Sequence, residues 1–555
     1  MQRALKMNTP TNDSPIADDG PQAGQFWLIA LVILLASILR GSLLFGTALM
    51  PGMNGAYYLV QARAVLTHGT LGLPDLPLIF YVQASLARVV SWVSGWDLDS
   101  CILFSVKLTD SILPALVALP VALLVRRWAK SAATPAWIAP VAAAAVTLSA
   151  PILDMVGNFE KNSLGLLWLC LLLLFIHLWL TRPTLPNAAG VLCFWGLAAL
   201  THIGVFGASV MFGGLAIAFY LVMRRGEGWR VLWPLLAATL AVGAIAAGVV
   251  LWKFDAGRVQ KLTAALLHPA DYLVGSNMGP GGPGGGPPGG MPGFPGGHTP
   301  AFFIVMQAGP SLAFAVVSIA ALLTCWRKRT GLSPADLCVA CACAVGVLVL
   351  TGPWVHGDKA PRFFLIAIAP AVMAAAFALI HCKHRRLRAG LAILGAACMI
   401  GPSFFVVCDG GRPAISEDGL RELRSLAPLI ANPNKTLVVA RHGMEWWASW
   451  ALHTHIAQAP ALRSADWQTF EAVYFLRSKN DNRPMPGGGP GAFSLLRMLG
   501  GGPPPPGGPP HGGPAHTMNP MDDPEIPRDA ETVHDGIQFI FSRVSAPPGF
   551  VSGHL

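Results

Sequence analysis

Charged side chains are scarce in this chain of 555 residues. Asp, Glu, Lys and Arg make up 12% of the sequence and hydrophobic residues make up 53%. The charged share of an average soluble protein is about 25%, so an ordinary soluble multidomain enzyme is excluded and most of the chain is expected to lie in lipid. Acidic residues (28) are fewer than basic ones (38), and the net charge of +10 is typical of the cytoplasmic loops of membrane proteins. No basic stripe is interleaved with aromatic residues, so we expect no nucleic-acid partner.

The chain also lacks a convincing metal motif and an ordinary signal peptide. Cys338, Cys341 and Cys343 form a C-x-x-C-x-C string, but they lie in an apolar run without a second cysteine pair or a nearby histidine. We therefore expect packed thiols there and no metal site. At the N-terminus, about 25 mostly polar residues precede an apolar run of about 20, which is too long for the hydrophobic segment of a cleavable signal. Residues 26–45 are predicted to be an uncleaved first span.

Long apolar runs are abundant. A membrane-spanning helix needs about 20 predominantly apolar residues. Candidate runs lie at 26–45, 77–94, 101–125, 132–150, 163–181, 186–203, 205–223, 231–252, 301–325, 332–354, 362–380 and 389–407.

Basic clusters between these runs orient the chain, because Lys and Arg concentrate on the cytoplasmic side. The clusters lie at 126–130, 224–225, 327–329 and 383–388. With the N-terminus inside, all four lie in the cytoplasm only if one early run does not cross. The run 77–94 is short and carries Gln83 and Arg88, so we predict an interfacial helix there and eleven spans. A twelve-span alternative with the N-terminus outside also places the clusters inside, but it moves Asn54 to the cytoplasm.

The predicted fold is mainly α: a polytopic membrane helix bundle of about 11 spans plus interfacial helices, followed by a small C-terminal α/β extracytoplasmic domain. Its parts are a cytoplasmic tail at 1–25, a transmembrane domain at 26–408 and the outer domain at 409–555. In the outer domain, periodicity predicts helices at 416–430 and 443–456 and strands at 435–440 and 536–544. Gly/Pro tracts interrupt the chain at 276–300, 485–491 and 500–514. The first has almost no side chains to bury, so we expect it to be disordered.

Three carboxylates of the predicted outer loops are candidates for acid–base chemistry. Asp75 lies in a proline-bracketed turn, and Asp154 and Glu160 share a short loop that also holds Lys161. A positioned carboxylate can accept a proton from a hydroxyl or hold a divalent cation. Solvated surface charges would leave the same pattern, so that interpretation stays open.

Polar side chains at the outer ends of spans are further candidates. Arg362 follows Pro361, and its planar guanidinium suits either a phosphate or the lipid headgroups. His202 lies near the outer end of a predicted span, where a hydrogen-bonded structural role is favoured over a functional one. Within one span, Lys107 and Asp110 lie one helical turn apart, as an internal ion pair or as cavity-lining groups.

Short motifs at these positions resemble those of GT-C-type membrane glycosyltransferases, which include oligosaccharyltransferase catalytic subunits, protein mannosyltransferases and aminoarabinose transferases. The string from Asn54 through Tyr57, Tyr58 and Ala62 is similar to the D-x-x-Y-Y-x-x-x-A pattern of the class. The segment 157–162 is similar to its G-x-F/Y-acid-N-x signature. The segments 200–202 and 361–363 and the outer α/β domain are similar to features that commonly accompany these motifs in the class. The resemblance therefore covers most of residues 26–460.

The resemblance implies a multi-pass enzyme of a prokaryotic inner membrane that transfers a sugar, with inversion, from a polyprenyl-phosphate donor to an extracytoplasmic glycan, lipid or protein. Glu160, Asp154 or Asp75 would act as the base or hold a divalent cation, and Arg362 with Lys359 would stabilise the lipid phosphate. The other expected substrate-binding residues are Asn54, Tyr57, Tyr58, Lys161, His202, Glu445 and Trp446.

One position departs from the pattern of the class. Asn54 stands where the class has an acid, and an amide cannot accept a proton. Either the role moves to another carboxylate, or the chain is inactive or uses different chemistry. Two other classes therefore stay open: a transporter or flippase for a lipid-linked substrate, and a non-catalytic membrane assembly protein.

Overall fold

The computed structural model describes most of the helical bundle and the sheet domain. Its described residues are 23–224, 309–328, 332–381, 412–458, 466–479 and 523–544, with short gaps inside some of these ranges, and isolated residues elsewhere. The Gly/Pro tracts predicted at 276–300, 485–491 and 500–514 lie outside them, as does Lys359.

Among the described residues, seven helical stretches are long and apolar enough to cross a membrane, so the chain is a multi-pass membrane protein. They are α1 (Ala23–Phe45), the continuous stretch Leu98–Ser131 that contains α4 (Leu98–Ile112) and α5 (Ala118–Ser131), α8 (Glu160–Thr181), α10 (Ile203–Arg224), α15 (Gly309–Lys328), α16 (Pro334–Thr351) and α17 (Ala360–His381).

The remaining predicted spans correspond to shorter or undescribed segments. Apolar stretches of 10–17 residues form α6 (Ile138–Thr147) with α7 (Ala150–Asp154), and α9 (Leu185–Thr201). The run predicted to lie at the interface forms α3 (Leu78–Ser94), whose exposed side chains include Trp92 and Val93. In the runs at 231–252 and 389–407 the structure describes only isolated residues or pairs, so neither run can be compared with its prediction.

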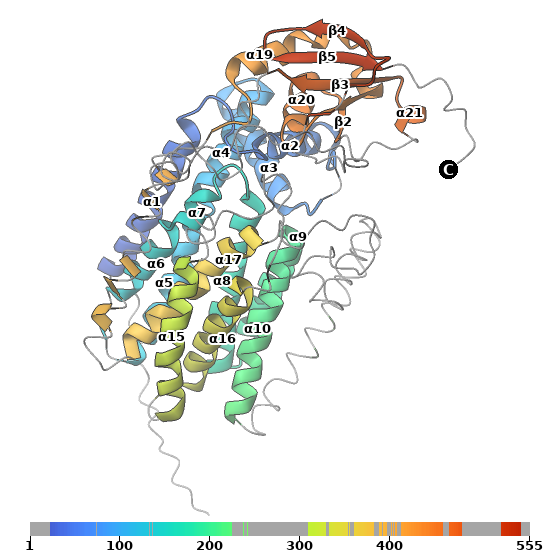
Figure 1. Ribbon diagram of the computed structural model, residues 1–555. Coiled ribbons are helices and arrows are strands. Elements are labelled where there is room, and N and C mark those ends of the chain that lie inside the picture. The colour runs from blue at the N-terminus through green and yellow to red at the C-terminus, as the bar shows by residue number, and fades with distance from the viewer. Residues whose placement is uncertain are drawn as a thin grey trace, which may run out of the picture.

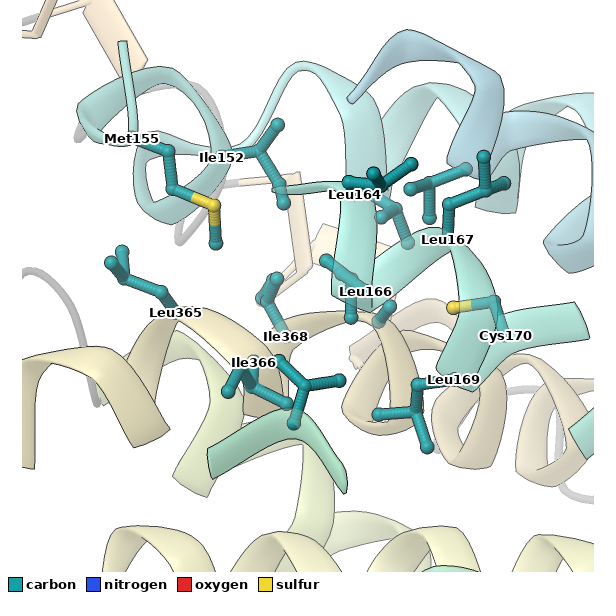
Figure 2. Packing of buried hydrophobic residues seen from close by; sticks show 14 of the residues in the cluster. Ile152, Met155, Leu164, Leu166, Leu167, Leu169, Cys170, Leu365, Ile366 and Ile368 are labelled. Atoms are coloured by element: carbon teal, nitrogen blue, oxygen red, sulfur yellow. The ribbon is translucent and has the colours of Figure 1, made fainter. Parts of the chain in front are cut away.

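The bundle is held together by close packing of apolar and small side chains. Figure 2 shows side chains from α7, α8 and α17 gathered in one cluster, among them Ile152, Leu166 and Ile368. A Cβ on Gly165 of α8 would come within 2.7 Å of Val205 on α10, so the missing side chain lets these two helices approach closely. Because lipid is as apolar as leucine, this complementarity of shape stabilises the bundle in the membrane.

The C-terminal domain contains a five-stranded mixed sheet in the order β2-β1-β3-β5-β4. Its strands are β1 (Thr436–Val439), β2 (His455–Ala457), β3 (Ala472–Ser478), β4 (Glu531–Asp535) and β5 (Phe539–Val544). β1 is parallel to both of its neighbours, and β5 is antiparallel to both of its own. The helices α19 (Glu417–Ser425), α20 (Met444–Leu452) and α21 (Asp466–Thr469) complete this domain.

The predicted elements of this domain are confirmed in type, with two helices shorter than expected. The helix predicted at 416–430 ends at Ser425, and a 3-10 turn containing Pro428 follows it. The helix predicted at 443–456 ends at Leu452, because His453 adopts a left-handed conformation with φ of 58° and Ile456 belongs to β2. Strands β2, β3 and β4 were not predicted.

The sheet domain sits at one end of the bundle, against α2 (Gly55–His68) and the residues just before it, which belong to the first of the two loops predicted to be outer (46–100 and 151–162) (Figure 1). The amide of Gly52 donates to the carbonyl of Arg412 at 2.9 Å. A Cβ on Gly443, whose φ is 90°, would lie 2.8 Å from Met53. Residues 52 and 53 therefore lie on the same side of the membrane as the sheet domain, which is incompatible with the twelve-span alternative.

Candidate active site

Helix α2 carries the first group of candidate residues. It begins after Asn54 and ends at His68, and the φ of 73° at the following residue, Gly69, suits glycine at a helix C-terminus. Tyr57 and Gln61 lie one turn apart on the same face, and the Gln61 amide donates to the Tyr57 hydroxyl at 3.3 Å. The Gln61 side-chain oxygen accepts from the Leu73 amide at 3.1 Å, and its NH2 group donates to the Leu73 carbonyl at 2.9 Å. Gln61 therefore fixes the turn that carries Asp75.

Asp75 is the point where the two predicted outer loops meet. Its Oδ2 accepts hydrogen bonds from the Tyr57 hydroxyl and from the ammonium of Lys161, the second residue of α8. The side chains of Asp75 and Lys161 keep 20% and 19% of their surface exposed, so a ligand can reach the pair. The Lys161 Nζ also lies 5.2 Å from the centre of the Tyr57 ring and 5.8 Å from that of Phe80.

The surroundings of Asp75 favour its ionised form. Burial raises the pKa of this carboxyl, but the Lys161 ammonium and the hydrogen bonds from Lys161, Tyr57 and the Leu76 amide outweigh burial and hold the pKa below its usual value. Asp75 is therefore an anion at neutral pH, with a fixed cation beside it.

His202 lies in the turn between α9 and α10, within electrostatic reach of the same group. Its Nδ1 accepts from the Val205 amide at 3.3 Å. Burial lowers its pKa to about 3, and the charges of Lys161 and Arg362 act in the same direction, against the influence of Asp75. The imidazole is therefore a neutral hydrogen-bonding group beside two cations.

Arg362 lies in the first turn of α17. Its side chain is exposed, and its guanidinium carbon lies 5.9 Å from the centre of the Phe159 ring, one residue before Glu160. The expected phosphate-binding arginine therefore lies at the same end of the bundle as Lys161 and His202.

The sheet domain adds an aromatic side chain to the group. The ring of Trp446 lies 4.8 Å from that of Tyr57, with an angle of 63° between them, and its buried indole N–H has no hydrogen-bond partner among the described residues. Glu445 is buried: its Oε1 lies 2.9 Å from His442 Nδ1 and accepts from the Gln458 amide at 2.9 Å. Trp446 thus faces the site, whereas Glu445 is held inside its own domain.

Four other predicted residues have supporting positions. Glu160 is 1% exposed and accepts from the Gln83 amide, and Tyr58 is buried with its hydroxyl accepting from the Lys161 amide at 3.4 Å. Asn54 and Asp154 are half-buried, at the start of α2 and the end of α7. The hydrogen bonds to Asp75 come instead from Tyr57, Lys161 and the Leu76 amide.

The internal ion pair considered for α4 is not formed. Lys107 donates to the carbonyls of Thr47 and Ala48 at 2.6 and 3.3 Å. Asp110 instead pairs with Arg40 of α1 at 2.8 Å, and both side chains are fully buried. The sequence reasoning did not single out Arg40, although a charged residue inside an apolar run was a usable signal.

Among the described residues, no three His, Cys, Asp or Glu side chains group as metal ligands. At Asp75, the Lys161 ammonium lies against Oδ2 and the Leu76 amide donates to Oδ1 at 2.7 Å, so both carboxylate oxygens are already engaged. This donor set does not fit such a cation.

Comparison with known proteins identifies the fold. No protein-family model and no curated protein matches the chain. The structure is similar to the Archaeoglobus fulgidus oligosaccharyltransferase in its apo form, with 14% sequence identity, a TM-score of 0.53, and coverage of 82% of this chain and 70% of that one. It is also similar to ArnT from Cupriavidus metallidurans bound to undecaprenyl phosphate, with 12% identity, a TM-score of 0.51, and coverage of 96% and 100%. The chain thus has the fold of the GT-C-type membrane glycosyltransferases.

Proposed function

We propose that this chain transfers a sugar from a polyprenyl-phosphate donor to an acceptor on the outer side of an inner membrane of a prokaryote. The observation that carries the proposal is the anionic Asp75 against Lys161 in a GT-C-type fold, with the neutral His202 in electrostatic reach of Asp75, Lys161 and Arg362. One solved neighbour, ArnT, was crystallised with undecaprenyl phosphate, a ligand of the proposed donor class.

The proposed step needs one base and one stabilised leaving group. Asp75 accepts the proton of the acceptor hydroxyl, and the acceptor oxygen then attacks the anomeric carbon of the donor sugar. The bond from that carbon to the phosphate oxygen breaks with inversion, and the lipid phosphate leaves with the electron pair. Arg362 and Lys161 supply positive charge where the negative charge develops. The neighbouring Lys359 lies outside the described residues and is expected to assist.

Asp75 takes over the base role that the class assigns to the position of Asn54. Of the three candidate carboxylates, Glu160 is 1% exposed and Asp154 is half-buried at the end of α7, whereas Asp75 binds Lys161 and Tyr57 and keeps 20% of its side chain exposed. While Lys161 is bound to it, Asp75 is a weak base. A donor phosphate that draws Lys161 toward itself would free the carboxylate for the proton.

The acceptor is expected to lie against Trp446 and Tyr57. Their rings form an aromatic wall beside Asp75, and such surfaces pack well against sugar rings and other apolar faces. A glycan, a lipid and a protein side chain all present a hydroxyl that could lie there.

Transport of a lipid-linked substrate has less support. A translocation path requires polar groups across the membrane, because an unpaired polar group in lipid is costly. Along α8 the side chains between Ser163 and His177 are apolar apart from the indole N–H of Trp168, which donates to Thr201, whereas Lys161, the partner of Asp75, lies at the first turn of the helix.

The test is transfer from a panel of radiolabelled polyprenyl-phosphate sugars to membrane extracts by the purified protein. Asp75→Asn and Arg362→Ala are each expected to lower turnover by at least about 100-fold, the usual scale for loss of a base or of a charge stabiliser. The matched controls Asp418→Asn and Arg421→Ala change exposed charges on α19 and should leave turnover unchanged. Full turnover in both site variants would contradict the proposal.

A further inference from the structure

A fully buried ion pair joins α1 and α4 inside the bundle. Arg40 is fully buried and uses all three of its guanidinium nitrogens. Its NH2 donates to Asp110 Oδ1 at 2.8 Å, its Nε donates to the Asp110 carbonyl at 2.9 Å, and its NH1 donates to the Ile152 carbonyl. A buried ion pair contributes little to stability, because removing its charges from water is costly. The contacts that the pair makes indicate another role.

The second oxygen of Asp110 reaches into the second outer loop. Asp110 Oδ2 accepts from the Gly157 amide at 2.8 Å. Gly157 has a φ of 71°, and a Cβ there would lie 2.1 Å from the carbonyl oxygen of Pro51. Because Arg40 donates to the Ile152 carbonyl and Asp110 accepts from the Gly157 amide, the pair binds the second outer loop at two points. Gly157 in turn lies in close contact with Pro51 of the first outer loop.

The next residue joins the two loops. Asn158 Oδ1 accepts from the amide of Met53 at 2.7 Å and from that of Asn54 at 3.4 Å. Immediately after these contacts the chain enters α2, which carries Tyr57, and α8, which carries Lys161. These two side chains meet at Asp75, so the loops joined through Asn158 set the relative positions of both partners of Asp75.

We propose that Arg40 and Asp110 are positioning residues that hold the two outer loops in register for the chemistry at Asp75. Neither residue touches Asp75, and the role rests on the function proposed above. The direct consequence is local: without the pair, the loop at 151–159 and the segment at 51–54 lose their anchor while the surrounding helices keep their packing.

The test is hydrogen–deuterium exchange of the full-length protein in lipid nanodiscs, followed by mass spectrometry. In Asp110→Asn, the segments 151–159 and 51–54 should exchange roughly tenfold faster or more, because a charged acceptor for Gly157 is lost and the local opening equilibrium shifts. The control Ser111→Ala removes a neighbouring buried hydroxyl that bonds only within α4, to the Lys107 carbonyl, and should exchange like the parent.

A double variant, Arg40→Leu with Asp110→Leu, covers the case in which the single change prevents folding. Replacing both charges leaves no unpaired buried charge within the pair, so this variant is expected to insert and fold. Faster exchange confined to the two loop segments would support the positioning role. Parent-like protection of those segments in a folded double variant would overturn it.

The exchange measurement needs no substrate, so its outcome is separate from that of the proposed function. Turnover in Asp110→Asn should fall through kcat, with little change in KM for the polyprenyl-phosphate sugar, because the phosphate-binding Arg362 lies on another helix. If no sugar transfer is found in any variant while loop exchange rises in Asp110→Asn, the coupling stands and the proposed reaction is wrong.

Discussion

Gly157 occupies a position where a side chain cannot fit. Its φ of 71° is strained for other residues, and a Cβ would lie 2.1 Å from the Pro51 carbonyl oxygen. We expect Gly157→Ala to lower stability by about 1–3 kcal/mol, a typical strain cost, and to lower the melting temperature measured in detergent. Gly207→Ala in α10, where nothing lies within 4 Å of the added Cβ, is the matched control. An equal melting temperature for both variants would refute the close approach of the two loops.

The residues of the candidate site were predicted unevenly, for a physical reason. Tyr57, Asp75 and Lys161 lie in polar outer segments, where local sequence shows that they are available for chemistry. That Lys161 binds Asp75 could not be predicted, because 86 residues separate them and only helix packing brings them together. The pairing of Arg40 with Asp110, 70 residues away, was missed for the same reason.

At the scale of elements, α2 and α20 are joined by one buried arginine. The Arg63 guanidinium lies 3.6 Å from the centre of the Trp450 ring, donates to the Trp450 carbonyl at 2.9 Å and binds both carboxylate oxygens of Asp99 at 2.9 Å. Arg63→Met keeps the apolar stem but loses these contacts, which together contribute about 2 kcal/mol. We expect faster proteolysis between the bundle and the sheet domain, with Arg421→Met on the exposed face of α19 as the unaffected control.

The same contact predicts a pH dependence at His453, whose Nδ1 lies 3.1 Å from the Arg63 guanidinium. Partial burial lowers the pKa of His453, Arg63 and Arg424 lower it further, and Asp99 opposes them. Because the pKa in the folded state lies below the unfolded value of about 6.5, docking is strongest above that pH and weakens as the pH falls. The ring stays partly exposed, so we expect a modest change, measured as increased proteolysis between pH 7 and 5. His453→Asn, which tolerates the left-handed backbone, should flatten this dependence; an unchanged profile would place the titration elsewhere.

The strands that were predicted have a decisive local sequence, although β3 (AVYFLRS) is equally apolar and aromatic and was not predicted. β1 and β5 are apolar and rich in β-branched or aromatic residues, which favours strands. β4 (ETVHD) is a polar edge strand and β2 has three residues, so neither has a clear pattern of its own. Both strands exist because a neighbouring strand pairs with them, which is a tertiary effect that a single sequence does not show.

At the scale of the whole molecule, the contacts between the first outer loop and the sheet domain predict that both are exposed on the same side of the membrane. Three variants test it with a membrane-impermeant maleimide on intact cells: Asn54→Cys, Asp418→Cys in the sheet domain, and Lys130→Cys at the end of α5. The first two should label from outside, the half-buried position 54 more slowly, and the third only after lysis, because basic residues mark the cytoplasmic side. If position 418 is labelled from outside while position 54 is protected until lysis, the two segments lie on opposite sides of the membrane. That result would contradict the Gly52–Arg412 hydrogen bond. Labelling of 130 alone would invert the molecule and place the proposed sugar transfer in the cytoplasm.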